Sequence, residues 1–396
     1  MRQFFGCAVA ALALAGCTAS YSGPVETLPA ANAVTVVTPP ERDPSELQVL
    51  FWNDEQRNTR FRDMESWFAG HEVKASADPR ALPEGERLPP RVTAAIREFM
   101  ADSNVAGLMV LEDGKVRFEE YALGFGPEQR WTSFSVAKSF TSTLLGAAVK
   151  DGFITSLDDP VTKYVPDLAG SAYDGVTVRQ IATMTSGVAW NEDYTDPNSD
   201  VAQMQEFINS YGADAMVAQL KELDRETAPG EKWVYKTGET NLIGMVVENA
   251  VGLPLATYAK EKIVDAAGFE GDLFWMSDPR GGSIGGCCLS IRLSDYARMG
   301  QFALEGGGDV VPEGWFAEAT APQVSFGERA PGYGYGYQWW TYPGGNYGAQ
   351  GIFGQAITVV PAENVVVAVV SNWPKATSSD FRQKWGELVG AIALAD

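Results

Sequence analysis

The stretch that most constrains this chain is residues 131–152, where a reactive pair of side chains coincides with a helical apolar pattern. Ser135 stands three residues before Lys138. After the serine an apolar residue recurs every four positions, at Val136, Phe140 and Leu144. This spacing predicts a helix, and positions i and i+3 share one helical face. The hydroxyl of Ser135 and the amine of Lys138 are therefore expected to meet in its first turn.

A lysine amine is a base only after it has lost its proton, and burial among apolar side chains lowers its reference pKa of about 10.4. Lys138 is therefore a candidate general base for a nucleophilic Ser135. The same pattern also fits a polar helix start with a snorkelling lysine. The chain has one histidine, His71, far before the apolar core. Because a Ser-His-Asp triad needs a histidine beside the nucleophile, Lys138 is the best base available to a serine hydrolase here.

The first 17 residues have the pattern of an export signal. Arg2 is the positive end, residues 8–15 are the apolar centre, and Leu14-Ala-Gly-Cys17 resembles a bacterial lipoprotein processing site. The apolar run is far below the roughly 20 residues of a membrane span. We predict lipid attachment at Cys17 and an exported, membrane-anchored periplasmic protein. The alternative is an ordinary cleaved signal peptide.

Composition divides the rest of the chain. Residues 18–45 contain prolines among small and polar residues, which is typical of a tether. Residues 46–90 begin with many aromatic side chains, so we expect an N-terminal extension that packs on the main domain. Residues 91–396 are predicted to form that domain, with a helical insert at about 153–234. No internal repeat is visible.

The main domain is predicted to be α+β: an antiparallel sheet flanked by helices and built from both ends of the domain. The expected helices are at 91–102, after Ser135, at 241–250 and after an N-cap at 378–380. The expected strands are 105–111, 115–121, 335–342, 355–360 and 365–371. An Asp113-Gly114 turn is predicted to join the first two strands as a hairpin.

Charge and cysteine usage exclude several functions. The net charge of −21 argues against nucleic acid and anionic lipid headgroups as partners. No Cys/His cluster has metal-ligand spacing, so no metal or cofactor is expected. Cys287 and Cys288 are adjacent and would pair only with strain, so we expect small buried thiols. Gly281-x-Ser283-x-Gly285 matches G-x-S-x-G, but no histidine follows it, which favours a glycine-rich loop.

Two further features have both a structural and a functional interpretation. Tyr235 lies about a hundred residues after Ser135 and is either a packing residue or a proton shuttle beside Lys138. The run 333–342 is aromatic at alternating and neighbouring positions. It is either a core strand or an aromatic wall beside a cleft, with Trp339 as the cleft-facing member.

The order of three motifs resembles the serine β-lactamase and penicillin-binding protein superfamily. The motifs are Ser135-x-x-Lys138, Tyr235-x-Thr237 and Ala349-Gln350-Gly351. The resemblance covers about residues 90–396. Four segments are similar to the class C β-lactamase-related branch that includes 6-aminohexanoate-dimer hydrolases and carboxylesterases: 183–187, 285–288, 295–300 and 351–355. It implies a β-lactamase/transpeptidase-like fold with an inserted helical subdomain.

The resemblance implies catalytic roles for these motifs. Ser135 would be the acylated nucleophile and Lys138 its base, while Tyr235 would take part in proton transfer to the leaving group. The backbone N–H groups of Ser135 and Ile352 would form the oxyanion hole. A helix N-terminus and a strand edge can flank one carbonyl oxygen, which agrees with that pairing.

The resemblance also implies substrate contacts, at Thr237, Tyr194, Ala349, Gln350 and Gly351. Thr237 departs from the family pattern because it replaces the usual asparagine. Ala349 departs because it replaces a lysine or histidine that helps bind a substrate carboxylate.

Three functions remain open from the sequence. The first is a lipid-anchored serine hydrolase that cleaves a small-molecule ester or amide through an acyl-enzyme. The second is a β-lactamase or D-alanyl-D-alanine peptidase. The third is a non-catalytic surface lipoprotein that binds cell wall or a partner. The intact set of Ser135, Lys138 and Tyr235 makes the third the weakest.

Overall fold

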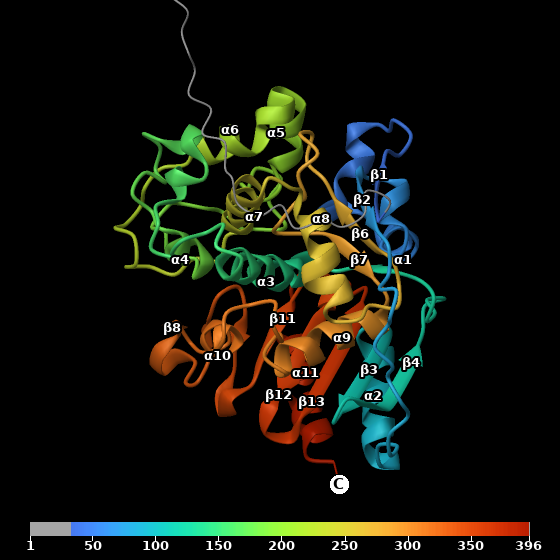
Figure 1. Ribbon diagram of the computed structural model, residues 1–396. Coiled ribbons are helices and arrows are strands. Elements are labelled where there is room, and N and C mark those ends of the chain that lie inside the picture. Colours follow the sequence, from blue (N-terminus) through green and yellow to red (C-terminus); the bar gives the residue numbers. More distant parts are fainter. Residues whose placement is uncertain (1–32, 396) are drawn as a thin grey trace, which may run out of the picture.

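The computed structural model describes residues 33–395, so Cys17 and the predicted signal lie outside the described residues. An eight-stranded antiparallel sheet forms the lower half of the molecule in Figure 1. Its strands, in spatial order, are β4 (Lys115–Tyr121), β3 (Val105–Glu112), β13 (Val365–Ser371), β12 (Ala356–Val360), β11 (Tyr347–Gln350), β10 (Trp340–Thr341), β9 (Gly334–Tyr335) and β8 (Val324–Ser325). The predicted sheet from both ends of the domain is therefore confirmed.

Helices cover both faces of this sheet, and β13 shows why. Its sequence VVVAVVS has no polar alternation, because every residue is buried. Val367 and Val369 face the helices α2 (Pro90–Asp102) and α11 (Ser379–Ala393). Val366 and Ala368 face the larger core under α9 (Leu293–Leu304). Ser378 caps α11 as predicted, since its side chain accepts a hydrogen bond from the backbone of Phe381.

The helix α3 (Ala137–Lys150), which directly follows Ser135, lies above the sheet beside α7 (Thr237–Val251) (Figure 1). Both are almost entirely buried, which explains their apolar sequences. Short helices complete the upper part: α4 (Val178–Ala182), α5 (Met204–Tyr211), α6 (Ala215–Glu222), and α8 (Leu255–Ala259) with a π-helical turn at Lys260–Asp265. The short helix α10 (Trp315–Ala319) lies lower, near β8 (Figure 1). Within residues 33–395, no single helix is long and apolar enough to cross a membrane. The helix α7 and the segment Leu255–Asp265, which is bent by 75° relative to it, meet the length and composition criteria only when they are taken together.

A second antiparallel sheet, which the sequence analysis did not predict, joins the N-terminal segment to the domain. Its order is β1 (Val34–Val37), β2 (Gly70–Val73), β6 (Leu273–Met276), β7 (Leu289–Ile291) and β5 (Trp131–Thr132). These strands have two to four residues. Runs this short carry too little periodicity to be recognised.

The segment between β1 and β2 packs against the start of α3. It contains the helix α1 (Asp54–Arg60), whose Arg57 donates a hydrogen bond to Asn372 at 2.6 Å. Phe61 is fully buried, and its ring centroid lies 4.9 Å from that of Phe134 in an edge-to-face pair. Trp52 and Met64 join the same core. The N-terminal segment therefore supports the turn that carries Ser135.

The predicted strand 335–342 was wrong in its continuity. The structure has the two short strands β9 and β10 with a turn between them. The turn residue Gln338 has φ +61°, and its side chain donates hydrogen bonds to the carbonyls of Ile181 and Ala182. A tertiary contact therefore overrides the local aromatic β-propensity here.

Candidate active site

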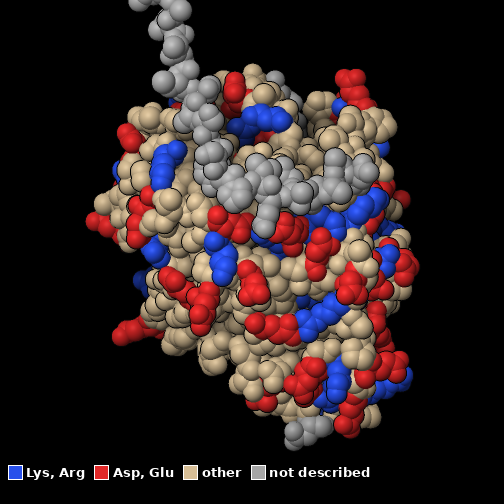
Figure 2. Space-filling view, in the orientation of Figure 1, with Lys and Arg blue, Asp and Glu red and all other residues tan. Residues whose placement is uncertain are grey.

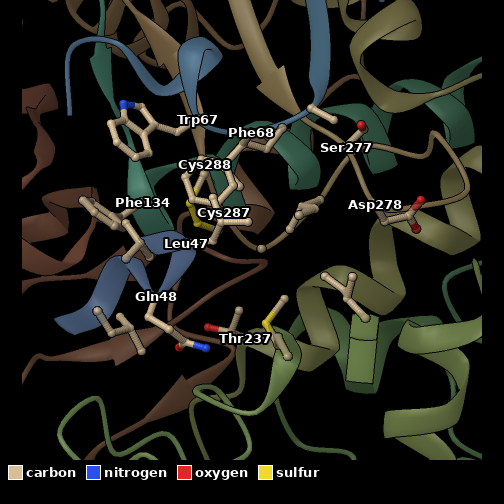
Figure 3. A pocket seen from close by; sticks show the side chains of 18 of the residues that line it. Leu47, Gln48, Trp67, Phe68, Phe134, Thr237, Ser277, Asp278, Cys287 and Cys288 are labelled. Carbon is tan, nitrogen blue, oxygen red and sulfur yellow. A yellow bond between two sulfur atoms is a disulfide. The ribbon is translucent and has the colours of Figure 1, made fainter. Parts of the chain in front are cut away.

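Ser135 lies in a single 3-10 turn, Phe134–Val136, directly before α3. Phe134 has φ +44°, which is unusual for a residue with a side chain and marks a strained turn. Its ring is held between those of Phe61 and Phe353. This packing fixes Ser135 at the wall of a cavity of about 470 Å³. In Figure 3, Phe134 lies at the left of that cavity and Thr237 lies below it.

Lys138 is the buried cation of the site, with only 1 % of its surface exposed. Its Nζ donates hydrogen bonds to Thr237 Oγ1 at 3.0 Å and to the carbonyl of Gly286 at 2.8 Å. Burial lowers the pKa of Lys138 to about 8, and the charge of Glu192 opposes that shift. The amine is therefore neutral in about a tenth of molecules at pH 7 and in about half of them at pH 8.

The two acceptors also orient the neutral amine. A neutral lysine has two N–H groups and one lone pair, and the two N–H groups are directed to Thr237 and Gly286. The lone pair is then free for a third direction. Ser135 precedes Lys138 by three residues at the same helix start, so its hydroxyl is a candidate proton source for that lone pair.

Tyr235 approaches the same place from the start of α7. Its ring centroid lies 5.3 Å from Lys138 Nζ, and its ring stacks on Trp340 at 5.6 Å with an interplanar angle of 23°. Burial raises the pKa of Tyr235, and the nearby Ser135 hydroxyl opposes that rise. The phenol therefore stays protonated and is a proton donor. The structure thus brings Ser135, Lys138 and Tyr235 together.

The two predicted oxyanion donors line the cavity. Ile352 lies in the turn that follows β11. The backbone N–H of Gly351 closes this turn by donating a hydrogen bond to the carbonyl of Gln355 at 2.8 Å. Within residues 33–395, neither the N–H of Ser135 nor that of Ile352 donates to a protein group outside its own short helix. Two free N–H groups beside a nucleophile suit a developing oxyanion.

Glu192 is the functional side chain that the sequence analysis missed. Its carboxylate accepts hydrogen bonds from the Thr237 backbone at 2.9 Å, from the Thr237 hydroxyl and from Tyr194 at 2.8 Å. Trp190 donates to it as well. A glutamate in a polar loop gives no local signal. The only indication was Thr237 itself, because a threonine in place of asparagine needs an acceptor for its hydroxyl.

The remaining predicted substrate contacts separate into two groups. Tyr194 and Thr237 line the cavity. Trp339 does not, and its predicted cleft-facing position was wrong: it is fully buried, with its ring centroid 6.0 Å from Phe316 and 5.6 Å from Tyr347. The neighbouring Trp340 is half-buried and stacks on the ring of Tyr235, but it does not line the cavity either.

Around the third motif the geometry also differs from expectation. Ala349 is 1 % exposed and belongs to the main core, so its side chain does not line the cavity. Gln350 donates to the Tyr342 hydroxyl at 2.7 Å. A cation does reach this strand from elsewhere, since Arg382 on α11 donates to the Gly351 carbonyl at 2.6 Å. Burial lowers the pKa of Arg382 to about 10, which leaves it charged at neutral pH.

The expectation of two separate thiols at Cys287 and Cys288 was also wrong. The structure joins the adjacent residues as a disulfide, and both line the cavity (Figure 3). Cys288 has φ +87°. A left-handed residue breaks the usual alternation of neighbouring side chains, so both sulfur atoms lie on the same side of the chain.

The antiparallel sheet lies under a helix that begins with the Ser135-x-x-Lys138 pair, and this pair lies beside the Tyr235-x-Thr237 motif. Together these features define a β-lactamase/transpeptidase-like serine hydrolase. The Beta-lactamase family model matches residues 92–391, and the chain belongs to that family. It is 31 % identical over 333 residues to the 6-aminohexanoate-dimer hydrolase of Paenarthrobacter ureafaciens, covering 76 % of this chain and 79 % of the relative.

Solved structures agree on the fold. A putative 6-aminohexanoate-dimer hydrolase from Bacillus anthracis superposes with a TM-score of 0.78 at 20 % identity, covering 90 % of this chain and 98 % of that one. A class C β-lactamase mutant superposes with a TM-score of 0.56 at 18 % identity, covering 76 % of this chain and 96 % of that one.

The glycine-rich loop around Ser283 has a structural explanation, since Ser283 Oγ accepts a hydrogen bond from Ala256 N at 3.0 Å.

Proposed function

We propose that this enzyme cleaves esters or amides through an acyl-enzyme on Ser135. The observation that carries the proposal is the buried amine of Lys138, whose two hydrogen bonds to Thr237 and Gly286 leave its lone pair for the serine proton. A buried lysine with a lowered pKa is a suitable general base near neutral pH.

The first half-reaction follows from the geometry. Lys138 accepts the Ser135 proton as the serine oxygen attacks the substrate carbonyl carbon. The N–H groups of Ser135 and Ile352 stabilise the negative oxygen of the tetrahedral intermediate. Tyr235 donates its proton to the departing alcohol or amine, and Lys138 returns a proton to Tyr235. The carbon–oxygen or carbon–nitrogen bond to the leaving group breaks, and the acyl group remains on Ser135.

The second half-reaction releases the acid. A water molecule loses a proton to the Lys138–Tyr235 pair and attacks the ester carbonyl of the acyl-enzyme. The bond between the acyl carbon and Ser135 then breaks, and the serine oxygen regains a proton. The family relative named as a 6-aminohexanoate-dimer hydrolase supports amide cleavage as one form of this reaction.

A β-lactamase or D-alanyl peptidase activity is the second candidate. Ala349 supplies no cation for a substrate carboxylate, but Arg382 places a charged guanidinium at the Gly351 carbonyl of the same strand. A charge-assisted hydrogen bond there would contribute about 1.5–3 kcal/mol. This observation keeps carboxylate-bearing substrates as the alternative to neutral esters.

We also propose that the enzyme is an exported lipoprotein, held at the membrane by a lipid on Cys17 alone. The Leu14-Ala-Gly-Cys17 sequence supports this anchor. The net charge of −21, with acidic side chains spread over the face shown in Figure 2, argues against a nucleic acid partner.

Intact-protein mass spectrometry tests the nucleophile. After incubation with a fluorophosphonate, the wild-type chain should gain one phosphonyl group, and the Ser135→Ala variant should gain none. The same samples are assayed with p-nitrophenyl acetate and with a chromogenic cephalosporin. Labelling and ester turnover that persist in Ser135→Ala would overturn the proposal. A cephalosporin kcat/KM far above that for the ester would favour the β-lactamase candidate.

A further inference from the structure

Much of the cavity wall beyond Ser135 comes from outside the hydrolase domain. Residues 38–42, 47–50 and 67–69 all line it, and all belong to the N-terminal segment. In Figure 3, Leu47, Trp67, Phe68 and Phe134 lie around the cavity near the cysteine pair. The N-terminal segment is therefore part of the binding site as well as a support for the nucleophile turn.

This wall is apolar, and its charged members are engaged elsewhere. Arg42 stacks on the Trp67 ring at 3.8 Å and donates to the Ser66 carbonyl at 2.9 Å. Asp278 forms an ion pair with Arg280 at 3.1 Å. Glu41 is exposed at the edge. Because the charges on this wall are already paired or face solvent, the cavity suits an uncharged, apolar group.

The catalytic groups show which part of the substrate enters the cavity. Ser135 and Ile352, which hold the reacting carbonyl, line it, whereas Tyr235 does not. Tyr235 supplies the leaving-group proton from the side of Trp340. The leaving group therefore lies toward Tyr235, and the acyl group extends into the cavity.

We propose that the N-terminal segment forms the binding site for an apolar acyl chain, so that the substrates are esters or amides of apolar carboxylic acids. This inference rests on the proposed acyl-enzyme function. The volume of about 470 Å³ is within the range of about 300–1,000 Å³ for pockets that enclose a small organic ligand. It is larger than an acetyl group requires.

The test measures kcat/KM for p-nitrophenyl esters from acetate to dodecanoate. Each methylene that the cavity buries should raise kcat/KM by about fourfold, until the chain exceeds the cavity. Leu47→Trp fills the wall with a larger ring. It should lower the ratio of the octanoate kcat/KM to the acetate kcat/KM by about tenfold or more.

A matched control comes from the same segment. Val36 is 71 % exposed on β1 and does not line the cavity, so Val36→Trp should keep the wild-type chain-length profile. Thermal unfolding of both variants checks that they fold.

Two outcomes would overturn the inference and leave the proposed function standing. They are a flat wild-type profile with normal acetate turnover, and an octanoate value that Leu47→Trp and Val36→Trp change equally. Absence of both ester turnover and fluorophosphonate labelling would instead overturn the proposed function, and the acyl-chain site with it.

Discussion

The hydroxyl of Thr237 accepts a hydrogen bond from Lys138 Nζ at 3.0 Å and donates its own proton to Glu192. Because a carboxylate only accepts, the direction of both bonds is determined. Glu192 thereby orients the Thr237 hydroxyl, which in turn orients the Lys138 amine. The charge of Glu192 also raises the pKa of Lys138, which burial lowers. Thr237 is a link in this chain of hydrogen bonds, in a position where the family pattern has asparagine.

The first prediction concerns pH. Burial holds the pKa of Lys138 at about 8, below its ordinary value, so the neutral base increases as pH rises through 8. We expect kcat/KM for p-nitrophenyl acetate to rise with pH and to level off above about pH 9. Initial rates from pH 5.5 to 10 in buffers of constant ionic strength check this. A profile that is level from pH 6 to 9 would contradict it.

The second prediction tests Glu192 as a positioning residue. Glu192→Gln removes a negative charge that raises the pKa of Lys138, so the acid limb of kcat/KM should move to lower pH. A purely structural loss would lower the whole profile without moving that limb. Glu226→Gln is the control, because Glu226 forms an exposed ion pair with Lys232 in the same part of the chain. We expect no movement of the limb in that variant.

The third prediction concerns the base itself. Lys138→Arg keeps a positive charge but cannot deprotonate, so it should be nearly as inactive as Lys138→Ala. Each should lose on the order of a hundredfold or more in kcat/KM. Fluorophosphonate labelling rates give a second readout. An active arginine variant would indicate a different base, with Tyr235 the next candidate.

The fourth prediction separates the hydroxyl of Tyr235 from its ring. Tyr235→Phe keeps the stacking on Trp340 and removes only the proton donor. We expect a loss of about a hundredfold in kcat/KM, with little change in thermal stability. The loss should be smaller for p-nitrophenyl esters than for anilides, because a nitrophenolate leaves without protonation. Equal losses on both would argue against a role in protonating the leaving group.

The fifth prediction is the lipid anchor. Expressed in bacteria, the full chain should incorporate radioactive palmitate and partition into detergent. Cys17→Ser should abolish both, since the acylated cysteine is removed. Unchanged labelling of the variant would refute the assignment.

Features set by neighbouring residues were predictable from the sequence. Asp113 and Gly114 have φ +51° and +71°, as the predicted hairpin turn between β3 and β4 requires. Ser378 caps α11, and the three-residue interval between Ser135 and Lys138 places them at one helix start. Each follows from a local backbone rule acting over a few residues, so the order of residues is sufficient to specify it.

Features that join distant segments required the tertiary structure. Glu192 reaches Thr237 across 45 positions, and Arg382 reaches Gly351 across 31. Trp339 is fully buried, whereas its neighbour Trp340 is half-buried and stacks on Tyr235, and the aromatic pattern of the sequence does not distinguish the two. The N-terminal wall of the cavity likewise consists of residues 38–42, 47–50 and 67–69, which lie between the strands β1 and β2 of the second sheet. A local pattern determines which side chains are available, whereas long-range packing determines which of them meet, because burial and hydrogen bonding depend on every segment that closes around the site.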